Sequence, residues 1–506
     1  MPELEKGDKN IKNDSLEDGI SRNTIPRETQ CMGLGKTDLA PFFSPKSIAI
    51  VGVSRKDYRL GGLSYLNKFK EYGFPGKLYP INPKATEILG TKTYPDLSSL
   101  PEVPDLAIVC VPAHQVPTIL EECARIGLRR IHILTSGFKE LGTQEGDFLE
   151  QRVSDISNEN GLLVIGPNCM GPYSPSGKMT PWGAIPGMSG PLAIISQSGG
   201  LTQRLTEYTS SLGIGVEKAV SMGNATVLST IDYLEFMARD DKIRVIALYL
   251  EGVRDGTTLF HLAREVSSKK PIILWKGGET AVGASTAASH TGGMAGEMRI
   301  WEAFCRQTGL IRVHSMDEWV DAIMAFSFLT APTGNGVFLI GGGGGISVSN
   351  SDLCIREGLD VPPLSEPTLA WLRRRGPSAG SIFGNPLDMW RVFSDPVYLT
   401  DLLNVAYKDP RMGMIIVDRL IQRKAFHIPE ALDPNPQLID FLKKKENRKP
   451  TVVTVDSGGG DLDLASKGTA LRAEFCKAKI PAYPSLQRAA KALVHLHHYH
   501  SHFVRT

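Results

Sequence analysis

The sequence predicts an α/β protein made of three doubly wound units, and two observations support this prediction. From Pro41 onward, short runs of aliphatic and β-branched residues alternate with amphipathic stretches. This succession of strand, crossover helix and strand is typical of parallel sheets covered by helices. The succession also starts three times along the chain, and each start runs into a glycine-bearing turn. We therefore expect three α/β domains in series.

The expected strands are short and apolar throughout, as strands buried on both faces of a parallel sheet are. In the first unit a helix over 115–126 lies between the second and third of the strands named here. The expected strands are 47–51, 106–111, 131–134 and 162–165 in the first unit, 191–195, 245–249 and 271–275 in the second, and 336–340, 414–417 and 451–455 in the third.

The domain boundaries follow from this pattern and from a change in composition near the N-terminus. Residues 1–40 are polar and contain no apolar segment, which predicts a disordered tail and argues against a secretory signal. The segment 331–336, which is rich in proline and glycine, separates the second and third units. We expect domains at about 41–180, 185–330 and 331–506.

Composition narrows the classes of partner. The net charge of +2 over 506 residues comes without a long basic run, so we expect no nucleic-acid partner. No apolar run reaches the length of about 18 residues expected of a membrane span, so we expect no membrane partner. The seven cysteines show neither a CxxC pair nor zinc-ligand spacing. We therefore expect free thiols and a cytoplasmic location.

Glycine-rich turns follow the first strand of each unit. Glycine lets the backbone approach an anion, and the free N–H groups at the start of the next helix point toward it. Neither a Walker A loop nor a G-x-G-x-x-G fingerprint is present, which disfavours a nicotinamide-dependent oxidoreductase. Tight strand-to-helix connection is the alternative interpretation. The predicted phosphate-binding residues are Ser196, Ser198, Gly199 and Gly200 in the second unit, and Gly343, Gly344 and Gly345 in the third.

The first unit carries polar and basic side chains at the predicted carboxyl edge of its sheet. Ser54, Arg55 and Lys56 follow the first strand, and Lys84 follows a further strand expected between 47–51 and 106–111. A nucleotide-like ligand binds at this edge in doubly wound sheets. Solvated surface charge is the alternative for each of these side chains.

His290 stands between small residues that leave its imidazole accessible. A histidine of this kind can act as a nucleophile, a base or a metal ligand. No second ligand stands at zinc spacing, so we expect no metal there. Glu251, which follows the strand 245–249, is positioned to orient the ring, and the two glycine-led helix starts offer anion donors. A purely structural histidine is the alternative.

Several motifs together resemble the NDP-forming acyl-CoA synthetases, the superfamily that contains succinyl-CoA synthetase. The resemblance covers residues 41–505 approximately, and the domains follow one another in the same order as in that superfamily. It implies a Rossmann-like CoA-binding domain followed by two flavodoxin-like CoA-ligase domains. The motifs are Ile48–Ser54, Asn82–Lys84, Gly166–Gly171, Ser196–Gly200, Val220–Asn224, Ser289–Gly292 and Asn385–Asp388.

The resemblance also implies roles for individual residues. It makes His290 the phosphorylated histidine, Glu251 its partner carboxylate, and the two glycine-led helix starts the phosphate-binding ends of the so-called power helices. The residues implied at the CoA site are Gly52, Ser54, Arg55, Lys84, Pro112 and Asn168, and those implied near the acyl group are Ser221, Gly223 and Asn224.

No segment resembles the ATP-grasp domain that binds the nucleotide in this superfamily. The layout resembles the alpha subunit of the ADP-forming acetyl-CoA synthetases, whose ATP-grasp domain lies on a separate beta subunit. We therefore expect acyl-CoA and phosphate as ligands of this chain, ADP or ATP with Mg on a partner ATP-grasp subunit, and a hetero-oligomer. The rival hypothesis is a non-catalytic regulatory or scaffold protein that binds CoA or acyl-CoA.

For two further features we expect no catalytic or metal-binding role. Five histidines crowd the C-terminus, and His498 and His502 share a helix face, but no carboxylate or cysteine accompanies them in sequence. We therefore expect no metal site there. Cys169 lies within the Gly166–Gly171 motif, and we expect it to pack as a small apolar side chain rather than act as a nucleophile.

Overall fold

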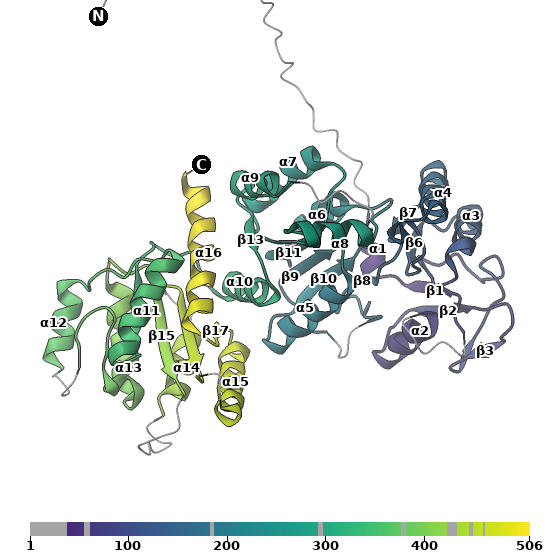
Figure 1. Ribbon diagram of the computed structural model, residues 1–506. Helices are drawn as coiled ribbons and strands as arrows, with labels where there is room; N and C mark the ends of the chain where they lie inside the picture. The colour runs from purple at the N-terminus through teal and green to yellow at the C-terminus, as the bar shows by residue number, and fades with distance from the viewer. Residues whose placement is uncertain are drawn as a thin grey trace, which may run out of the picture. The chain divides into compact units, whose positions relative to one another are not determined.

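Three separate sheets, each flanked by helices, form the fold of the computed structural model (Figure 1). The described residues all belong to one compact unit, Asp38–Thr506. None of the helices within them is long and apolar enough to cross a membrane. The predicted tail lies outside the described residues, apart from its last three positions. The structure describes residues 38–54, 61–182, 187–291, 297–375, 381–421, 433–444, 449–458 and 461–505, without the side chains of 287–291, 390, 420, 504 and 505.

The first sheet is parallel and has the strand order β2-β1-β5-β6-β7. The strand order reverses between β1 and β5, which opens a crevice at the carboxyl edge. Every residue of β1 is buried, as its apolar sequence predicts. The elements are α1 (Ala40–Phe43), β1 (Ser47–Val51), α2 (Gly62–Glu71), β2 (Lys77–Ile81), β3 (Glu87–Ile88), β4 (Thr91–Lys92), β5 (Leu106–Val109), η1 (Ala113–Gln115), α3 (Val116–Ile126), β6 (Arg130–Ile133), η2 (Lys139–Leu141), α4 (Gln144–Asn160) and β7 (Leu163–Ile165).

The second sheet has the order β13-β12-β11-β9-β10-β8 and is parallel except for its edge strand β8. Its order reverses between β9 and β11. Helices α5 and α10 pack together on one side, and α6, α7 and α9 on the other (Figure 1). The elements are β8 (Gly171–Tyr173), β9 (Leu192–Ser196), α5 (Gly199–Ser211), β10 (Val216–Ser221), α6 (Thr230–Ala238), β11 (Val245–Leu250), α7 (Gly256–Ser267), β12 (Ile272–Lys276), α8 (Ala281–Thr291), α9 (Met298–Thr308), β13 (Ile311–Val313) and α10 (Met316–Phe328).

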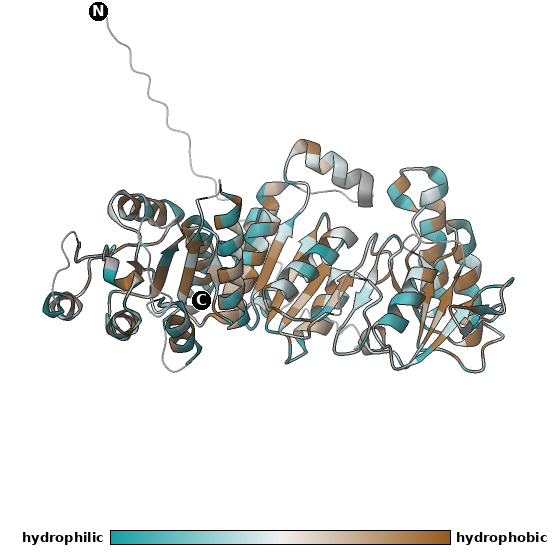
Figure 2. Ribbon diagram, turned by 90° about the horizontal axis from the view of Figure 1, so that it is seen from below, coloured by the Kyte–Doolittle hydropathy of each residue, from teal (hydrophilic) through white to brown (hydrophobic). Residues whose placement is uncertain are grey.

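The third sheet is parallel, with the order β14-β15-β16-β17. Its strands are apolar and buried, and the surrounding helices turn polar faces outward (Figure 2). The elements are β14 (Val337–Ile340), α11 (Gly344–Glu357), α12 (Glu366–Arg374), η3 (Trp390–Phe393), α13 (Pro396–Lys408), β15 (Met414–Leu420), α14 (Asn435–Lys443), β16 (Thr451–Asp456), α15 (Leu462–Lys477), β17 (Ala482–Tyr483) and α16 (Leu486–Arg505).

The C-terminal helix α16 joins the second and third sheets, because it packs on both α10 and α11. Arg488 of α16 donates two hydrogen bonds to the carboxylate of Asp321 in α10, at 2.6 and 2.9 Å. His495 of the same helix lies 3.0 Å from Glu318. Two of the three α/β units are therefore tied together by the Arg488–Asp321 ion pair and the contact between His495 and Glu318.

Nine of the ten named strands are confirmed within two residues at either end, and the tenth, predicted at 414–417, continues to Leu420 in β15. The helix predicted at 115–126 is confirmed as α3, and a helix follows each of the three glycine-bearing turns. Strand β10 was not predicted, because Glu217 and Lys218 interrupt its apolar pattern. Strand β8 lies inside the predicted first domain, yet it pairs with β10 of the second sheet. The second sheet therefore begins before residue 180, and the domain boundaries as such stay a prediction.

Candidate functional site

The predicted CoA-site residues gather at one edge of the first sheet. Each follows the carboxyl end of a strand, and parallel strands bring these ends together. Gly52 and Ser54 follow β1, Lys84 follows β2, Pro112 follows β5 and Asn168 follows β7. Arg55, also predicted there, lies outside the described residues.

Gly52 shapes the turn after β1. Its φ is +91°, and a Cβ at this position would lie 2.9 Å from the carbonyl oxygen of Cys110. A side chain there would therefore push the turns after β1 and β5 apart. Asn82 closes the other side, because its Nδ2 donates to the carbonyl of Val53 at 2.6 Å and its Oδ1 accepts the N–H of Lys84 at 2.8 Å. Lys84 is thereby exposed at the crevice edge.

The motif that ends the first sheet meets the predicted acyl loop. Asn168 Nδ2 donates to Asn224 Oδ1 at 3.3 Å, and the N–H of Asn224 donates to the carbonyl of Pro167 at 3.1 Å. A Cβ at Gly223, whose φ is +54°, would lie 2.2 Å from that carbonyl. Only glycine permits this approach. Residues 56 positions apart are thus in direct contact, as the predicted roles require.

Asn224 also binds two carboxylates that the sequence did not single out. Its Nδ2 donates to Glu140 at 2.7 Å and to Glu150 at 2.8 Å. Glu150 is buried and lies 3.6 Å from Arg254. Glu140 lies in the 3-10 helix η2 and Glu150 in α4. No local pattern marks either residue, so only the folded chain reveals the cluster.

Ser221 has a structural part in this arrangement. Its side chain is fully buried, and its Oγ accepts the N–H of Met170 at 3.1 Å. Ser221 therefore fixes β8 against β10 and, through Met170, the end of the Gly166–Gly171 motif.

The start of α5 is open at one of its two glycines. Ser196 Oγ accepts the N–H of Ser198 at 3.0 Å and donates to the carbonyl of Ser198 at 2.9 Å. Ser198 Oγ in turn caps α5 by accepting the N–H of Leu201 at 3.3 Å. A Cβ at Gly199 would lie 2.9 Å from Met170, whereas one at Gly200 would meet nothing within 4 Å. Gly200 is therefore where an anion can approach the helix start.

Glu251 lies beside this helix start, where the order of the second sheet reverses. The side-chain oxygen of Gln197 accepts the N–H groups of both Glu251 and Gly252, the second at 3.2 Å. Tyr249 donates to the Glu251 carboxylate at 3.4 Å, and burial, followed by the charge of Glu251, raises the pKa of Tyr249. The carboxylate thus sits at the crevice where ligands bind in doubly wound sheets.

His290 belongs to α8, but its side chain lies outside the described residues. The helix itself packs against η2, which contains Glu140. Since Glu140 binds Asn224, α8 reaches the side of the predicted acyl loop. The pairing of His290 with Glu251 stays a prediction.

The glycine run of the third unit binds a carboxylate that belongs to the same chain. Gly341, Gly342, Gly343 and Gly344 all have positive φ values, and α11 begins at Gly344. Asp388 accepts the N–H of Gly344 at 2.6 Å. A Cβ at Gly345 would meet nothing within 4 Å. The predicted phosphate-binding end of α11 thus carries a carboxylate that the sequence analysis did not place there.

Cys169 and two of the C-terminal histidines contact other residues of the chain. Cys169 is buried, its Sγ lies 3.6 Å from the carbonyl of Ile133, and burial raises the pKa of its thiol. At the C-terminus His495 pairs with Glu318 and His497 lies 3.3 Å from Ser501. Within the described residues, no group of three or more histidine, cysteine, aspartate or glutamate side chains is arranged so that it could hold a metal ion.

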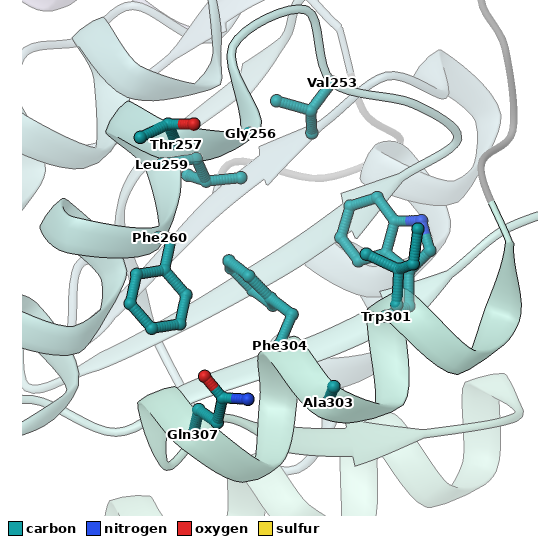
Figure 3. A pocket seen from close by; sticks show the side chains of 10 residues that line it. Val253, Gly256, Thr257, Leu259, Phe260, Trp301, Ala303, Phe304 and Gln307 are labelled. Atoms are coloured by element: carbon teal, nitrogen blue, oxygen red, sulfur yellow. The ribbon is translucent and has the colours of Figure 1, made fainter. Parts of the chain in front are cut away.

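A cavity of about 530 Å³ lies between α7 and α9, beside the loop that follows Glu251 (Figure 3). It is mainly apolar, and the polar side-chain groups among its lining residues belong to Thr257, Trp301 and Gln307. No charged residue lines it. The lining residues are Val253, Gly256, Thr257, Leu259, Phe260, Ile300, Trp301, Ala303, Phe304 and Gln307.

The first and second units of the chain both match known protein domains. Residues 46–174 match the model of a CoA binding domain, and residues 189–326 match that of a succinyl-CoA ligase like flavodoxin domain. The alpha subunit of ADP-forming acetate–CoA ligase I from Pyrococcus furiosus is 35% identical over 90% of this chain and 96% of its own length. The chain belongs to the ADP-forming acyl-CoA synthetase family.

Other members of the family extend this result. ADP-forming acetate–CoA ligase II from Archaeoglobus fulgidus is 35% identical over 70% of this chain, which matches 52% of that longer protein. A solved structure of dinucleotide-forming acetyl-coenzyme A synthetase 1 from Candidatus Korarchaeum cryptofilum, in complex with phosphate and ADP, has a TM-score of 0.80 and 31% identity over 92% of this chain and 98% of its own. The predicted fold class is thereby confirmed.

Proposed function

We propose that this chain is the alpha-type subunit of an ADP-forming acyl-CoA synthetase, an acid–thiol ligase that works through a phosphohistidine at His290. The observation that carries the proposal is the contact between Asn168 and Asn224, which joins the predicted CoA edge to the predicted acyl loop. Acyl-CoA bound along the first sheet would place its thioester at this junction.

The chemistry proceeds in two steps on this chain. An oxygen of inorganic phosphate attacks the thioester carbon, the C–S bond breaks, and CoA leaves as the thiolate, which then takes a proton. A ring nitrogen of His290 next attacks the phosphorus of the acyl phosphate, the P–O bond breaks, and the acid leaves as its carboxylate. Glu251 would accept a hydrogen bond from the other ring nitrogen and stabilise the positive ring. The open N–H groups near Gly200 would bind the phosphoryl oxygens.

The phosphoryl group then needs an acceptor outside this chain. We propose ADP, bound with Mg on a partner ATP-grasp subunit, so that the active enzyme is a hetero-oligomer. The size of the Archaeoglobus relative supports this, because the chain spans about half of it. The six described cysteines are free, which suits the cytoplasm as the proposed location.

Labelling with radioactive phosphate tests the proposal. The purified chain, given acetyl-CoA and labelled phosphate, should acquire an acid-labile, base-stable label that His290→Ala lacks. His261→Ala, which changes an exposed histidine of α7, should label like the unchanged chain. Tight CoA binding without label from any short or aromatic acyl-CoA would favour the non-catalytic CoA-binding alternative.

A second experiment tests whether transfer of the phosphoryl group to ADP requires a partner subunit. Adding ADP and Mg to the labelled chain alone should leave the label in place, whereas adding a co-purifying nucleotide-binding subunit should discharge it as ATP. Discharge by ADP with the isolated chain would contradict the need for a partner.

A further inference from the structure

Lys276 ends β12 and has only 1% of its surface exposed. Its Nζ donates to the carbonyl of Gly277 and lies 5.4 Å from the centre of the Trp301 ring. A buried ammonium is costly unless an opposite charge compensates it, and neither of these partners is an anion. Burial lowers the pKa of Lys276. The positive charge of Lys276 must therefore be compensated by nearby carboxylates.

Three charged groups act on Lys276 from the neighbouring elements. Glu251 follows β11, Glu279 follows β12, and Arg312 lies in β13. Both carboxylates raise the pKa of Lys276, with Glu251 the more effective, and Arg312 lowers it. Glu279 has two other partners, since it lies 3.3 Å from Arg312 and 3.0 Å from His314. Glu251 is therefore the main counter-charge.

The backbone explains how Glu251 comes so near. Leu250 and Lys276 are partners in the β11–β12 register, and the N–H of Gly277 donates to the carbonyl of Leu250 at 2.9 Å. A Cβ at Gly277 would lie 3.2 Å from Cγ of Glu251. Glycine thus lets the Glu251 side chain lie against the chain directly after Lys276.

We propose that Lys276 is a positioning residue, whose buried ammonium keeps the carboxylate of Glu251 ionised and directed at the phosphohistidine site. The role of the target site rests on the proposed function of His290, but the pairing itself does not. A neutral carboxylic acid would no longer be the anionic acceptor that orients an imidazole and stabilises its charge. Trp301 covers the ammonium from α9, and the exclusion of water strengthens the interaction.

An infrared pH titration tests the pairing without any reaction. The carboxyl band of Glu251 is assigned by its loss in Glu251→Gln. In Lys276→Met this band should appear at a pH about one unit higher than in the unchanged chain, because the neighbouring positive charge is gone. Lys270→Met is the matched control: Lys270 is half-buried, donates to the carbonyl of Asp240 at 2.6 Å and precedes the opposite end of β12, so the band should not move. An unshifted band in Lys276→Met overturns the proposal.

The labelling assay adds a second measurement. Lys276→Met should slow phosphohistidine formation by an amount that approaches about tenfold at pH values below the one at which its Glu251 band appears, with recovery as the pH rises and Glu251 ionises. In a Glu251→Gln background the same substitution should cost less than about twofold. An equal, pH-independent loss in both backgrounds would mean that Lys276 is merely structural. Lys276→Gln serves as a second neutral variant should the Met variant unfold, as judged by circular dichroism. If the unchanged chain takes no label while the infrared shift is present, the proposed function fails and the pairing stands.

Discussion

Asp388 and Gly344 are joined by a 2.6 Å hydrogen bond, in which the carboxylate accepts the first N–H of α11. The parallel bridge between Ile340 and Leu387 holds this segment beside β14, so that the carboxylate reaches the helix start. The chain thus supplies its own anion at a position where the sequence predicts phosphate.

Asp388→Asn should strengthen phosphate binding. A charge at a helix N-terminus contributes about 1 kcal/mol, so removing the competing carboxylate should tighten binding about fivefold. Calorimetric titration with inorganic phosphate measures the effect. Asp395→Asn is the control, because Asp395 caps α13 by accepting the N–H of Tyr398 at 2.9 Å instead of an N–H of α11. Weaker phosphate binding in Asp388→Asn would mean that the carboxylate supports the site rather than competes for it.

Asn224→Ala should destabilise the junction between the first two sheets. The substitution removes the donor shared by Glu140 and Glu150 and leaves two adjacent carboxylates facing each other. Loss of such buried hydrogen bonds should lower the free energy of unfolding by about 2 kcal/mol, as measured by urea denaturation. Asn158→Ala, at an exposed position of α4, should change it by less than about 0.5 kcal/mol. Equal stability of the two variants would show that the cluster is not important for the fold.

Gly171→Ala should be costly because of His132. The φ of Gly171 is +75°, and a Cβ there would lie 2.4–2.6 Å from three atoms of the imidazole ring. The backbone strain and the clash together should lower the free energy of unfolding by about 3 kcal/mol. Gly127→Ala has a similar φ of +80° with nothing within 4 Å, so it should cost only about 1 kcal/mol. In a His132→Ala background the two glycine substitutions should become equal.

His132 should make stability depend on pH. Burial lowers its pKa from 6.5 to about 4, so the unfolded chain binds the proton more readily between these values. The stabilising contribution is therefore full above pH 6.5 and is lost as the pH falls through 4, by up to roughly 3 kcal/mol. Urea denaturation between pH 4 and 7 measures this as the difference between the unchanged chain and His132→Phe. A difference that stays constant with pH would contradict the burial of a neutral imidazole.

Ten of the strands that build the three sheets could be predicted because their residues are apolar on both faces, whereas β2, β8, β13 and β17 were not named. Strand β10 could not be predicted, since Glu217 is charged in sequence but buried in the fold, where Ser176 and Ser189 donate to it at 2.8 and 2.6 Å. Such compensation comes from residues far along the chain and leaves no local signal.

Some residues of the candidate site could likewise be predicted from the sequence, and others could not. Turns that follow strand ends, such as Gly52 and Lys84, could be placed because parallel strands end at one edge. The partners Glu140 and Glu150 of Asn224, and Asp388 of Gly344, depend on contacts between residues 44 to 84 positions apart. Local spacing does not encode these distances.

Strand β8 bears on how this chain can be divided. Residues 171–173 continue directly from the Gly166–Gly171 motif, yet their hydrogen bonds belong to β10 in the second sheet. A fragment that ends after Tyr173 would carry an unpaired edge strand, and a fragment that starts after it would expose the edge of β10. A fragment boundary between the first two units should therefore be placed before residue 171, so that β8 stays with the sheet that it pairs with.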